Sequence, residues 1–451
     1  MNSLQQYLEL FLNNREAVDS HSAHLLNLQR ERALEVLEHA TLPRLREEGY
    51  VVTSPDELFA PDYGVNINRI NIPADVAAAF RCDVPNMSTL LGVVVNDSFH
   101  PSATLAARIP QGVTFCSLRE ACERFPGVVK EHLGTIAPVT DPAVALNTLL
   151  TQEGVFIHIG RGVRVDRPLQ LVNLFSSPAP LMGVRRVLIV AEEGSEASVL
   201  VCDHTGNADV GFLSSQVVEI SVGDGARLDY YDMESSTPAT SRHSSLFVRQ
   251  ERDSRFNAGN FTLACGTTRN NINIDVAGTG CETFVGGMAI ASDSQRVDNN
   301  SRINHLAPRC KSNQMFKYVL DGEARGGFEG RILVTAEAQF TEAYQSNRNM
   351  LASADARMHT EPQLEIYCDE VKCSHGATTG QLDEDALFYM RQRGIPLRQA
   401  RTMLMQAFMA DVIDAVSMES LRDRLRHLVE RRFEGASESC SACAGQCNKT
   451  K

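Results

Sequence analysis

Two cysteines and a histidine, Cys368, Cys373 and His375, lie within eight residues of one another in the segment IYCDEVKCSHGATTG. In an extended strand the side chains of Cys373 and His375 point to the same side, because side-chain direction alternates with a period of two. A thiolate and a neutral imidazole can both bind zinc or the iron of a cluster. A buried thiol beside a turn histidine fits the spacing equally well. The pair therefore indicates either part of a metal or cluster site or a structural turn.

A second thiol-rich segment is the tail from residue 436 to 451, which contains Cys440, Cys443 and Cys447. Its CxxC spacing suits two thiolates on one metal ion, and a third thiolate leaves one position of a tetrahedral site open. The tail has few apolar residues to bury, which is typical of a disordered segment. Two hypotheses remain open for it: transient metal binding by the three thiolates, and an unstructured tail without a specific ligand.

Composition and charge exclude several classes of protein. The formal net charge of −13 argues against nucleic acid as a partner, because phosphate binding needs clustered Lys and Arg. No apolar run reaches the ~18 residues of a membrane-spanning helix. The 12 cysteines follow an N-terminus without a basic start, so we expect reduced thiols and a cytoplasmic protein.

Other catalytic patterns are weak. The sequence contains no phosphate-binding GxxxxGK[ST], no GxGxxG before a helix and no HExxH. We expect DHTG at 203–206 and SRH at 241–243 to be solvated turns rather than a hydrolase site. Asp229, Asp232 and Glu234 could serve as the acid pair of a polysaccharide enzyme. The absence of Trp makes carbohydrate stacking difficult, so this enzyme class remains only an alternative.

The surrounding elements change character twice along the chain. Helical stripes dominate the beginning, alternating strands follow from about residue 151, and helices return at Asp383. Short turn motifs recur at intervals of roughly 30 residues, which favours stacked coils over a β-sandwich. They lie at 160–165, 194–199, 223–230, 252–257, 279–285, 322–328 and 353–359. We expect an N-terminal helical region (1–85), a mixed α/β connecting segment (86–150), a parallel β-helix core (151–382), a C-terminal helical domain (383–435) and a flexible tail (436–451).

Longer motifs carry a resemblance to a known family. They read LFAPDYGVNINR, ALNTLLTQEGVFIHIGRGVRVDRPLQLVN, VRQERDSRF, NHLAPRCKSNQMFKYVLDGEARGGFEGRILV, AQFTEAYQSNRNMLAS and VKCSHGATTGQLDEDALFYMRQRGIP. In this order they resemble the SufB/SufD family of iron–sulfur cluster assembly proteins over most of residues 57 to 430. The resemblance implies a mainly β fold, with a right-handed parallel β-helix between flanking helical parts. The segment CSHGATTGQLD, with His375, is similar to the SufD branch rather than the SufB branch.

The resemblance also implies a function. A SufD-like chain pairs with a SufB-like paralogue, and a transient iron–sulfur cluster forms at their boundary near His375 and Cys373. Cys368 stands where the family usually has alanine, so no shared role is implied for it. Such a subunit binds no ATP and is not an enzyme by itself. A chain in the SufB role would need a functional cysteine in place of His375, and this remains a second alternative.

A SufC-like ABC-type ATPase is the other implied partner, and it docks on the C-terminal helices. Asp383 is the expected N-cap of the first of these helices, and Gly394 its C-terminal stop. Apolar residues cover more of these helices than one internal face requires, so we expect one face to dock the ATPase. The candidate docking residues are Leu387, Phe388, Tyr389, Met390, Met403 and Phe408.

Overall fold

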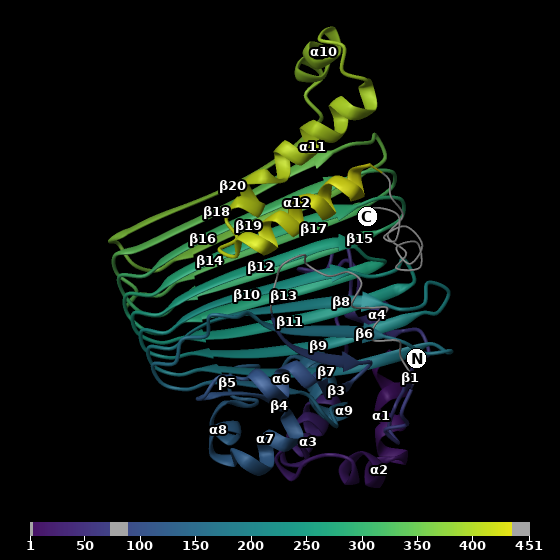
Figure 1. The fold of residues 1–451 in the computed structure, drawn as a ribbon, viewed down its shortest axis with the longest axis vertical. Coiled ribbons are helices and arrows are strands. Elements are labelled where there is room, and N and C mark those ends of the chain that lie inside the picture. Colours follow the sequence, from purple (N-terminus) through teal and green to yellow (C-terminus); the bar gives the residue numbers. More distant parts are fainter. Residues whose placement is uncertain (1–2, 73–88, 435–451) are drawn as a thin grey trace.

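The computed structural model describes residues 3–72 and 89–434, and its centre is a parallel β-solenoid with helices at both ends (Figure 1). Consecutive strands alternate between two sheets, so each coil of the chain contributes one strand to each sheet. The sixteen strands from β5 to β20 form eight coils in this way. This confirms the expected parallel β-helix, and the β-sandwich alternative is wrong.

Two ten-stranded sheets, called sheet A and sheet B here, run the length of the solenoid. Sheet A contains β1 (Gly64–Val65), β4 (Val113–Ser117), β5 (Val155–Ile159), β7 (Leu181–Ala191), β9 (Phe212–Val222), β11 (Thr240–Gln250), β13 (Thr267–Val276), β15 (Arg296–His305), β17 (Arg325–Val334) and β19 (Arg357–Ile366). Sheet B contains β2 (Leu90–Val95), β3 (Ser98–Pro101), β6 (Leu169–Phe175), β8 (Glu196–Thr205), β10 (Arg227–Ser235), β12 (Arg255–Ala264), β14 (Glu282–Ala291), β16 (Lys311–Leu320), β18 (Thr341–Leu351) and β20 (Val371–Gln381).

The turns at one corner of the solenoid are stacked by hydrogen bonds between backbones. Gly162, Gly194 and Gly225 each have a positive φ there, a conformation that glycine adopts without strain. The Gly162 N–H donates to the Glu193 carbonyl at 2.8 Å, and the Gly194 N–H donates to the Asp224 carbonyl at 2.8 Å. The repeated motifs at 160–285 therefore mark one such turn per coil. The motifs at 322–328 and 353–359 lie at the other corner, between a sheet B strand and the next sheet A strand, so the sequence repeats belong to two sets of turns.

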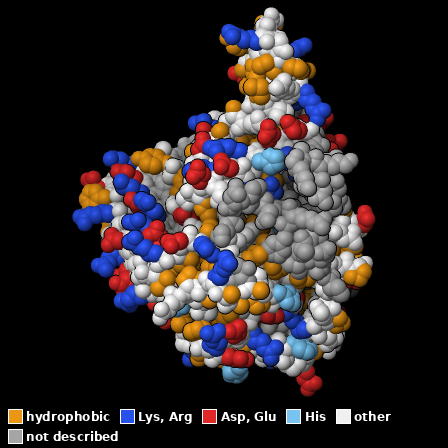
Figure 2. All heavy atoms as spheres, viewed as in Figure 1, with side chains coloured by type: hydrophobic (Ala, Val, Ile, Leu, Met, Phe, Trp, Pro, Cys, Tyr) orange, Lys and Arg blue, Asp and Glu red, His pale blue; other side chains and the backbone are white. Residues whose placement is uncertain are grey.

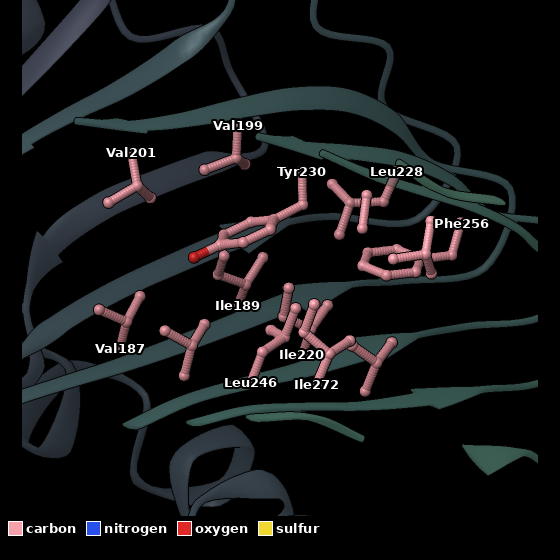
Figure 3. Close-up of a cluster of buried hydrophobic side chains, with 14 of the residues drawn as sticks. Val187, Ile189, Val199, Val201, Ile220, Leu228, Tyr230, Leu246, Phe256 and Ile272 are labelled. Atoms are coloured by element: carbon pink, nitrogen blue, oxygen red, sulfur yellow. The ribbon is translucent and has the colours of Figure 1, made fainter. Parts of the chain in front are cut away.

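Inside the solenoid, one side of each coil is apolar. Figure 3 shows Val187, Ile189 and Ile220 from sheet A facing Val199 and Leu228 from sheet B. All of these side chains are buried, and each coil stacks its apolar residues on those of the next coil. The solenoid is therefore held together mainly by hydrophobic packing along its axis.

Helices from both ends of the chain cover the outer faces of the sheets. The N-terminal helices are α1 (Ser3–Asn13), α2 (Arg15–Ser20), α3 (His24–Leu37), α4 (Pro55–Phe59), α6 (Ala103–Arg108), α7 (Leu118–Arg124), α8 (Pro126–His132) and α9 (Pro142–Leu150). Every residue of β7 and β9 is buried, since α9 packs on both strands. The alternating pattern of exposed and buried residues appears only in the later strands, where less of the outer face is covered.

The expected connecting segment already takes part in the sheets. β2 and β3 lie at the edge of sheet B, and β4 lies at the edge of sheet A. The two sheets thus extend beyond the core boundary expected at residue 151. None of the helices in the described part of the chain has the length and apolar character needed to cross a bilayer.

The C-terminal helices follow the last strand. They are α10 (Glu384–Gln392), α11 (Leu397–Asp414) and α12 (Glu419–Phe433). α11 and α12 lie on the outer face of sheet B, where Val412 and Leu425 join an apolar cluster with Met288 and Phe261. α10 projects beyond the solenoid with the start of α11 (Figure 1).

Candidate functional site

The last coil of the solenoid is open. Among the described strands, β19 pairs only with β17 and β20 only with β18, so both sheets end there on a strand with one free edge. The inward-facing side chains of this coil are also not covered by another coil of the described chain. A free edge with unpaired N–H and C=O groups is a ready template for pairing with another chain. The open coil is thus the natural place for contact with a partner.

Cys373 and His375 both belong to this open coil. On β20 they lie in register with Ala343 and Gln345 of β18, which are buried inside the solenoid. The two side chains therefore continue an interior row, as their spacing predicted. Cys373 is half-buried, whereas His375 is exposed.

The environment of Cys373 is mostly apolar. Its side chain packs against a small cluster that includes Ile332, Val334 and Ala343. Burial raises the pKa of the Cys373 thiol, although a hydrogen bond from the Ala343 backbone opposes the shift. The thiol is therefore not activated within this chain, and the exposed imidazole of His375 is the more accessible ligand. A neutral imidazole offers a nitrogen lone pair to a metal without first losing a proton from a thiol.

Gln345 is a site residue that the motif analysis missed. It lies next to His375 on the preceding coil, is 4% exposed, and neither atom of its amide has a hydrogen-bond partner in the structure. A buried amide without a partner is costly, so it marks a place where a further polar group fits. The one signal for it in the sequence is its position 30 residues before His375, which is one coil of the repeat.

Polar residues also lie beside His375 at the end of the solenoid: Asn347 and Asn349 on β18 of the preceding coil, and Thr360 and Thr379 on the open coil. The Asn349 side-chain amide donates to Asn347 Oδ1 at 2.6 Å and to Thr379 Oγ1 at 3.2 Å. The Thr360 hydroxyl donates to the same Asn347 oxygen at 2.8 Å. The end of the solenoid is thus a hydrogen-bonded polar surface beside His375, rather than a closed apolar cap.

The described residues do not form a complete metal site. Within residues 3–72 and 89–434, no group of three His, Cys, Asp or Glu side chains is arranged to hold a metal ion. Cys373 and His375 supply at most two ligands, so a metal or cluster bound here would need ligands from elsewhere. The three tail cysteines, Cys440, Cys443 and Cys447, lie outside the described residues, and metal binding by them stays a prediction.

The candidate docking residues on the C-terminal helices fall into two groups. Phe388, Tyr389 and Met403 are 64%, 58% and 42% exposed, and Figure 2 shows hydrophobic side chains gathered on the projecting hairpin of α10 and α11. Met390 is half-buried. Two of the six residues, Leu387 and Phe408, instead serve internal packing: Leu387 is buried, and Phe408 packs against the apolar cluster between sheet B and the helices α11 and α12.

The carboxylates considered for a polysaccharide enzyme do not line an open cleft. Asp232 and Glu234 are buried inside the solenoid, where Arg242 donates to Asp232 at 2.5 Å and Thr268 donates to Glu234 at 2.8 Å. Burial raises the pKa of Glu234 to about 7. Asp229 faces outward and accepts a hydrogen bond from Ser417 of the loop before α12. The three groups therefore cannot act together on a polymer.

The expectation of solvated turns at 203–206 and 241–243 is wrong. Asp203 and His204 lie in β8, Arg242 and His243 lie in β11, and all four are buried. Arg242 pairs with Asp203 at 2.9 Å inside the solenoid. Asp203 and Arg242 face the interior of the solenoid, whereas His204 and His243 face outward and are covered there, His243 by Phe59 of α4. The prediction of turns was wrong because these polar residues continue the strands.

Comparison with known proteins covers most of the chain. Residues 175–408 match the family model described as the SUF system FeS cluster assembly, SufBD core domain, and residues 1–171 match the SufBD protein N-terminal region. An iron–sulfur cluster assembly SufBD family protein of Synechocystis is 28% identical over 90% of both chains. The chloroplastic protein ABCI7 of Arabidopsis thaliana is 28% identical over 75% of this chain and 72% of its own. The iron–sulfur cluster assembly protein SufD of Escherichia coli is 29% identical over 65% of this chain and 70% of its own.

Proposed function

This chain belongs to the SufBD family of iron–sulfur cluster assembly proteins, and on that premise we propose that it is the SufD-type scaffold subunit of a three-protein assembly complex. In this role it pairs with a SufB-like paralogue and carries a SufC-like ATPase. The iron–sulfur cluster is cargo that forms transiently between the subunits. The complex acts in the cytoplasm, where the cysteines of the chain stay reduced.

The observation that carries this proposal is the open last coil with His375 on it. His375 and Cys373 occupy interior positions, yet no further coil of the described chain covers them. A paralogue with the same solenoid can place its own open edge against β19 and β20, since strands add to free edges through backbone hydrogen bonds. Its side chains would then complete the ligand set that this chain leaves unfinished.

The projecting hairpin supports the second partner. Phe388 and Tyr389 are large apolar side chains on a helix that touches the body mainly through α11. Exposed aromatic residues of this kind are enriched at protein interfaces. A hairpin that stands clear of the solenoid can also move with an ATPase without unfolding the β-sheets, and that movement would open or close the boundary near His375.

A scaffold of this kind is not an enzyme by itself. Among the described residues, Cys373 and His375 are too few ligands to hold a cluster, and in this proposal the ATP is bound by the partner. The buried carboxylates Asp232 and Glu234 leave the polysaccharide enzyme without a reachable acid pair. The alternative is that this chain itself has the SufB-like role. That role would require a functional cysteine at the position that His375 occupies.

Cluster loading of the complex tests the proposal. The chain is purified alone and together with the paralogue and the ATPase from the same source, and each sample is incubated anaerobically with iron and sulfide. The complex should develop the visible absorption of a cluster, while the isolated chain should not. Equal loading of the isolated chain would contradict the proposal, and so would failure of the chain to copurify with the other two proteins.

A further inference from the structure

Cys281 and Cys310 lie side by side on neighbouring coils. The Lys311 N–H donates to the Cys281 carbonyl at 2.8 Å, and Glu282 is in register with Lys311, so the two preceding cysteines are also adjacent. Neighbouring strands are about 4.8 Å apart. A disulfide requires a Cα–Cα separation of about 4.4 to 6.8 Å, so the backbone spacing already suits one.

Both thiols also approach the same backbone atom. The Sγ of Cys281 lies 3.1 Å from the Gly278 carbonyl oxygen, and the Sγ of Cys310 lies 3.2 Å from it. The Ser254 hydroxyl is 3.5 Å from the Cys281 sulfur. Both cysteines are reduced and buried, directly inside the turn from 278 to 280. The two sulfurs are thus held toward each other beneath a single short turn.

The two thiols differ in acidity. Hydrogen bonding from the Cys310 thiol, assisted by Ser254, lowers the pKa of Cys281, and the same interaction raises the pKa of Cys310. A thiol with a lowered pKa is the better nucleophile near neutral pH, because the thiolate is the reactive form. Cys310 keeps its proton and lies next to Cys281, so it can act as the resolving thiol that reacts with the oxidised Cys281 sulfur.

We propose that Cys281 and Cys310 form a peroxide-sensitive pair that closes reversibly into a disulfide between two coils of the solenoid. The Cys281 thiolate attacks hydrogen peroxide, which breaks the O–O bond; the sulfur is oxidised to a sulfenic acid and hydroxide leaves. The Cys310 sulfur then attacks the sulfenic sulfur and loses its proton, and the hydroxyl leaves as water. One peroxide and two thiols thus become one disulfide and two waters. Peroxide is no larger than a few atoms and reaches the pair when the turn opens locally.

A second buried pair of cysteines provides a matched control. Cys116 in β4 and Cys122 in α7 belong to one buried cluster at the N-terminal end of the solenoid, away from the coils of Cys281 and Cys310. Burial raises the pKa of Cys116 to about 12 and that of Cys122 to about 11. This pair is buried like the first one, but neither thiol is acidified. General unfolding would expose both pairs to peroxide, whereas a lowered thiol pKa would speed the oxidation of Cys281 alone. The control pair therefore distinguishes the two causes.

The experiment treats the full chain with hydrogen peroxide and follows each cysteine by peptide mapping without reduction. The peptides of Cys281 and Cys310 should become linked at least about tenfold faster than those of Cys116 and Cys122, and dithiothreitol should release them. The rate at which the Cys281 and Cys310 peptides become linked should rise with pH mainly below about 8.5, the ordinary pKa of a thiol, because the pKa of Cys281 is lowered. Circular dichroism before and after treatment verifies that the protein stays folded.

Two variants assign the roles within the pair. With Cys310→Ser, Cys281 should remain as a sulfenic acid that dimedone traps, and with Cys281→Ser, Cys310 should stay reduced. The proposal is overturned if Cys281 and Cys310 remain reduced in the folded wild-type chain while exposed thiols are oxidised. It is also overturned if the control pair becomes linked at the same rate. Neither result depends on cluster assembly, so the test is independent of the proposed function.

Discussion

Gln345 and His375 occupy the same register position on consecutive coils of sheet B, yet Gln345 is buried and His375 is exposed. The difference arises because β20 is the last strand of its sheet, so no described strand lies above His375. An interior position has become a surface position at the end of the solenoid. For this reason the proposed site is one that a second chain would complete.

His375→Ala should disable cluster assembly by the complex without unfolding this chain. The imidazole is exposed, so we expect its removal to change the free energy of unfolding by no more than about 0.5 kcal/mol. The matched control is His359→Ala on β19, which removes another exposed histidine of the same coil. Cluster formation is followed by visible absorption and stability by urea denaturation. Wild-type assembly by the His375 variant would show that the imidazole is not a ligand.

A charge at the open end should block pairing with the paralogue. Ala377 continues the inward row above Asn347, whereas Thr378 points to the opposite face of β20. Ala377→Arg should therefore strongly reduce copurification of the paralogue, because an arginine there lies where the partner must pack. Thr378→Arg should have a smaller effect. If both variants pair as the wild type does, the partner does not use this end of the solenoid.

The hairpin surface should be specific for the ATPase. Phe388→Asp places a charge on the exposed part of α10, so we expect loss of ATPase binding while pairing with the paralogue persists. His427→Asp is the control, since it places the same charge on the exposed side of α12, which packs on the solenoid. Pull-down of both partners from one sample measures the two interactions together. Equal loss in the two variants would indicate a general charge effect rather than a docking surface.

The hydrogen bond between Lys317 and Asp411 should make the attachment of α11 depend on pH. Lys317 Nζ donates to Asp411 Oδ2 at 2.6 Å, and this bond lowers the pKa of the Asp411 carboxyl. A lowered pKa means that the stabilisation is complete above the unfolded value of about 3.9 and is lost as the pH falls through the folded value. Asp411 is 59% exposed, so solvent screening limits the effect to about 0.5–1 kcal/mol.

Asp411→Asn tests this dependence. The variant should be less stable than the wild type at pH 7, and the difference should shrink as the pH falls below the unfolded value of about 3.9 and through the lower folded value. Asp423→Asn, which removes a more exposed ion pair with Arg426, should cost less. Urea denaturation at a series of pH values gives the three curves. A difference between wild type and Asp411→Asn that stays constant with pH would contradict the assigned cause.

Much of the fold could be predicted from local signals. Asp383 caps α10 by accepting a hydrogen bond from the Ala386 N–H at 2.9 Å, and Gly394 has the positive φ of a helix stop. The 30-residue spacing of turns predicted stacked coils, because one coil needs two strands and two turns. Longer-range effects were not predictable. The segment with Arg242 was predicted to be a solvated turn, and only the assembled solenoid shows that Arg242 is buried and paired with Asp232 inside it.

The site was predictable only in part for the same reason. The spacing of Cys373 and His375 placed them on one side of a strand, and this is confirmed by their register with Ala343 and Gln345. Sequence spacing could not indicate that the strand ends its sheet or that Cys373 packs in an apolar cluster. It also could not separate Leu387, which is buried, from its exposed neighbour Phe388. These properties depend on what lies next to a residue in space.

The most direct test of the account is photo-crosslinking from the open edge. A photoreactive residue replaces Gly376, which follows His375 on the edge strand β20 and faces its other side, where an added side chain meets no described atom within 4 Å. A probe on this edge strand still lies next to any strand that pairs with it. Gly127 in α8 is equally open and lies near the other end of the solenoid, so it is the matched control (Figure 1). In the intact complex, irradiation should join the chain to the SufB-like paralogue from position 376 and not from position 127. An intact complex that gives no such adduct from position 376, or gives it from position 127, would contradict the claim that the open coil is the site of pairing.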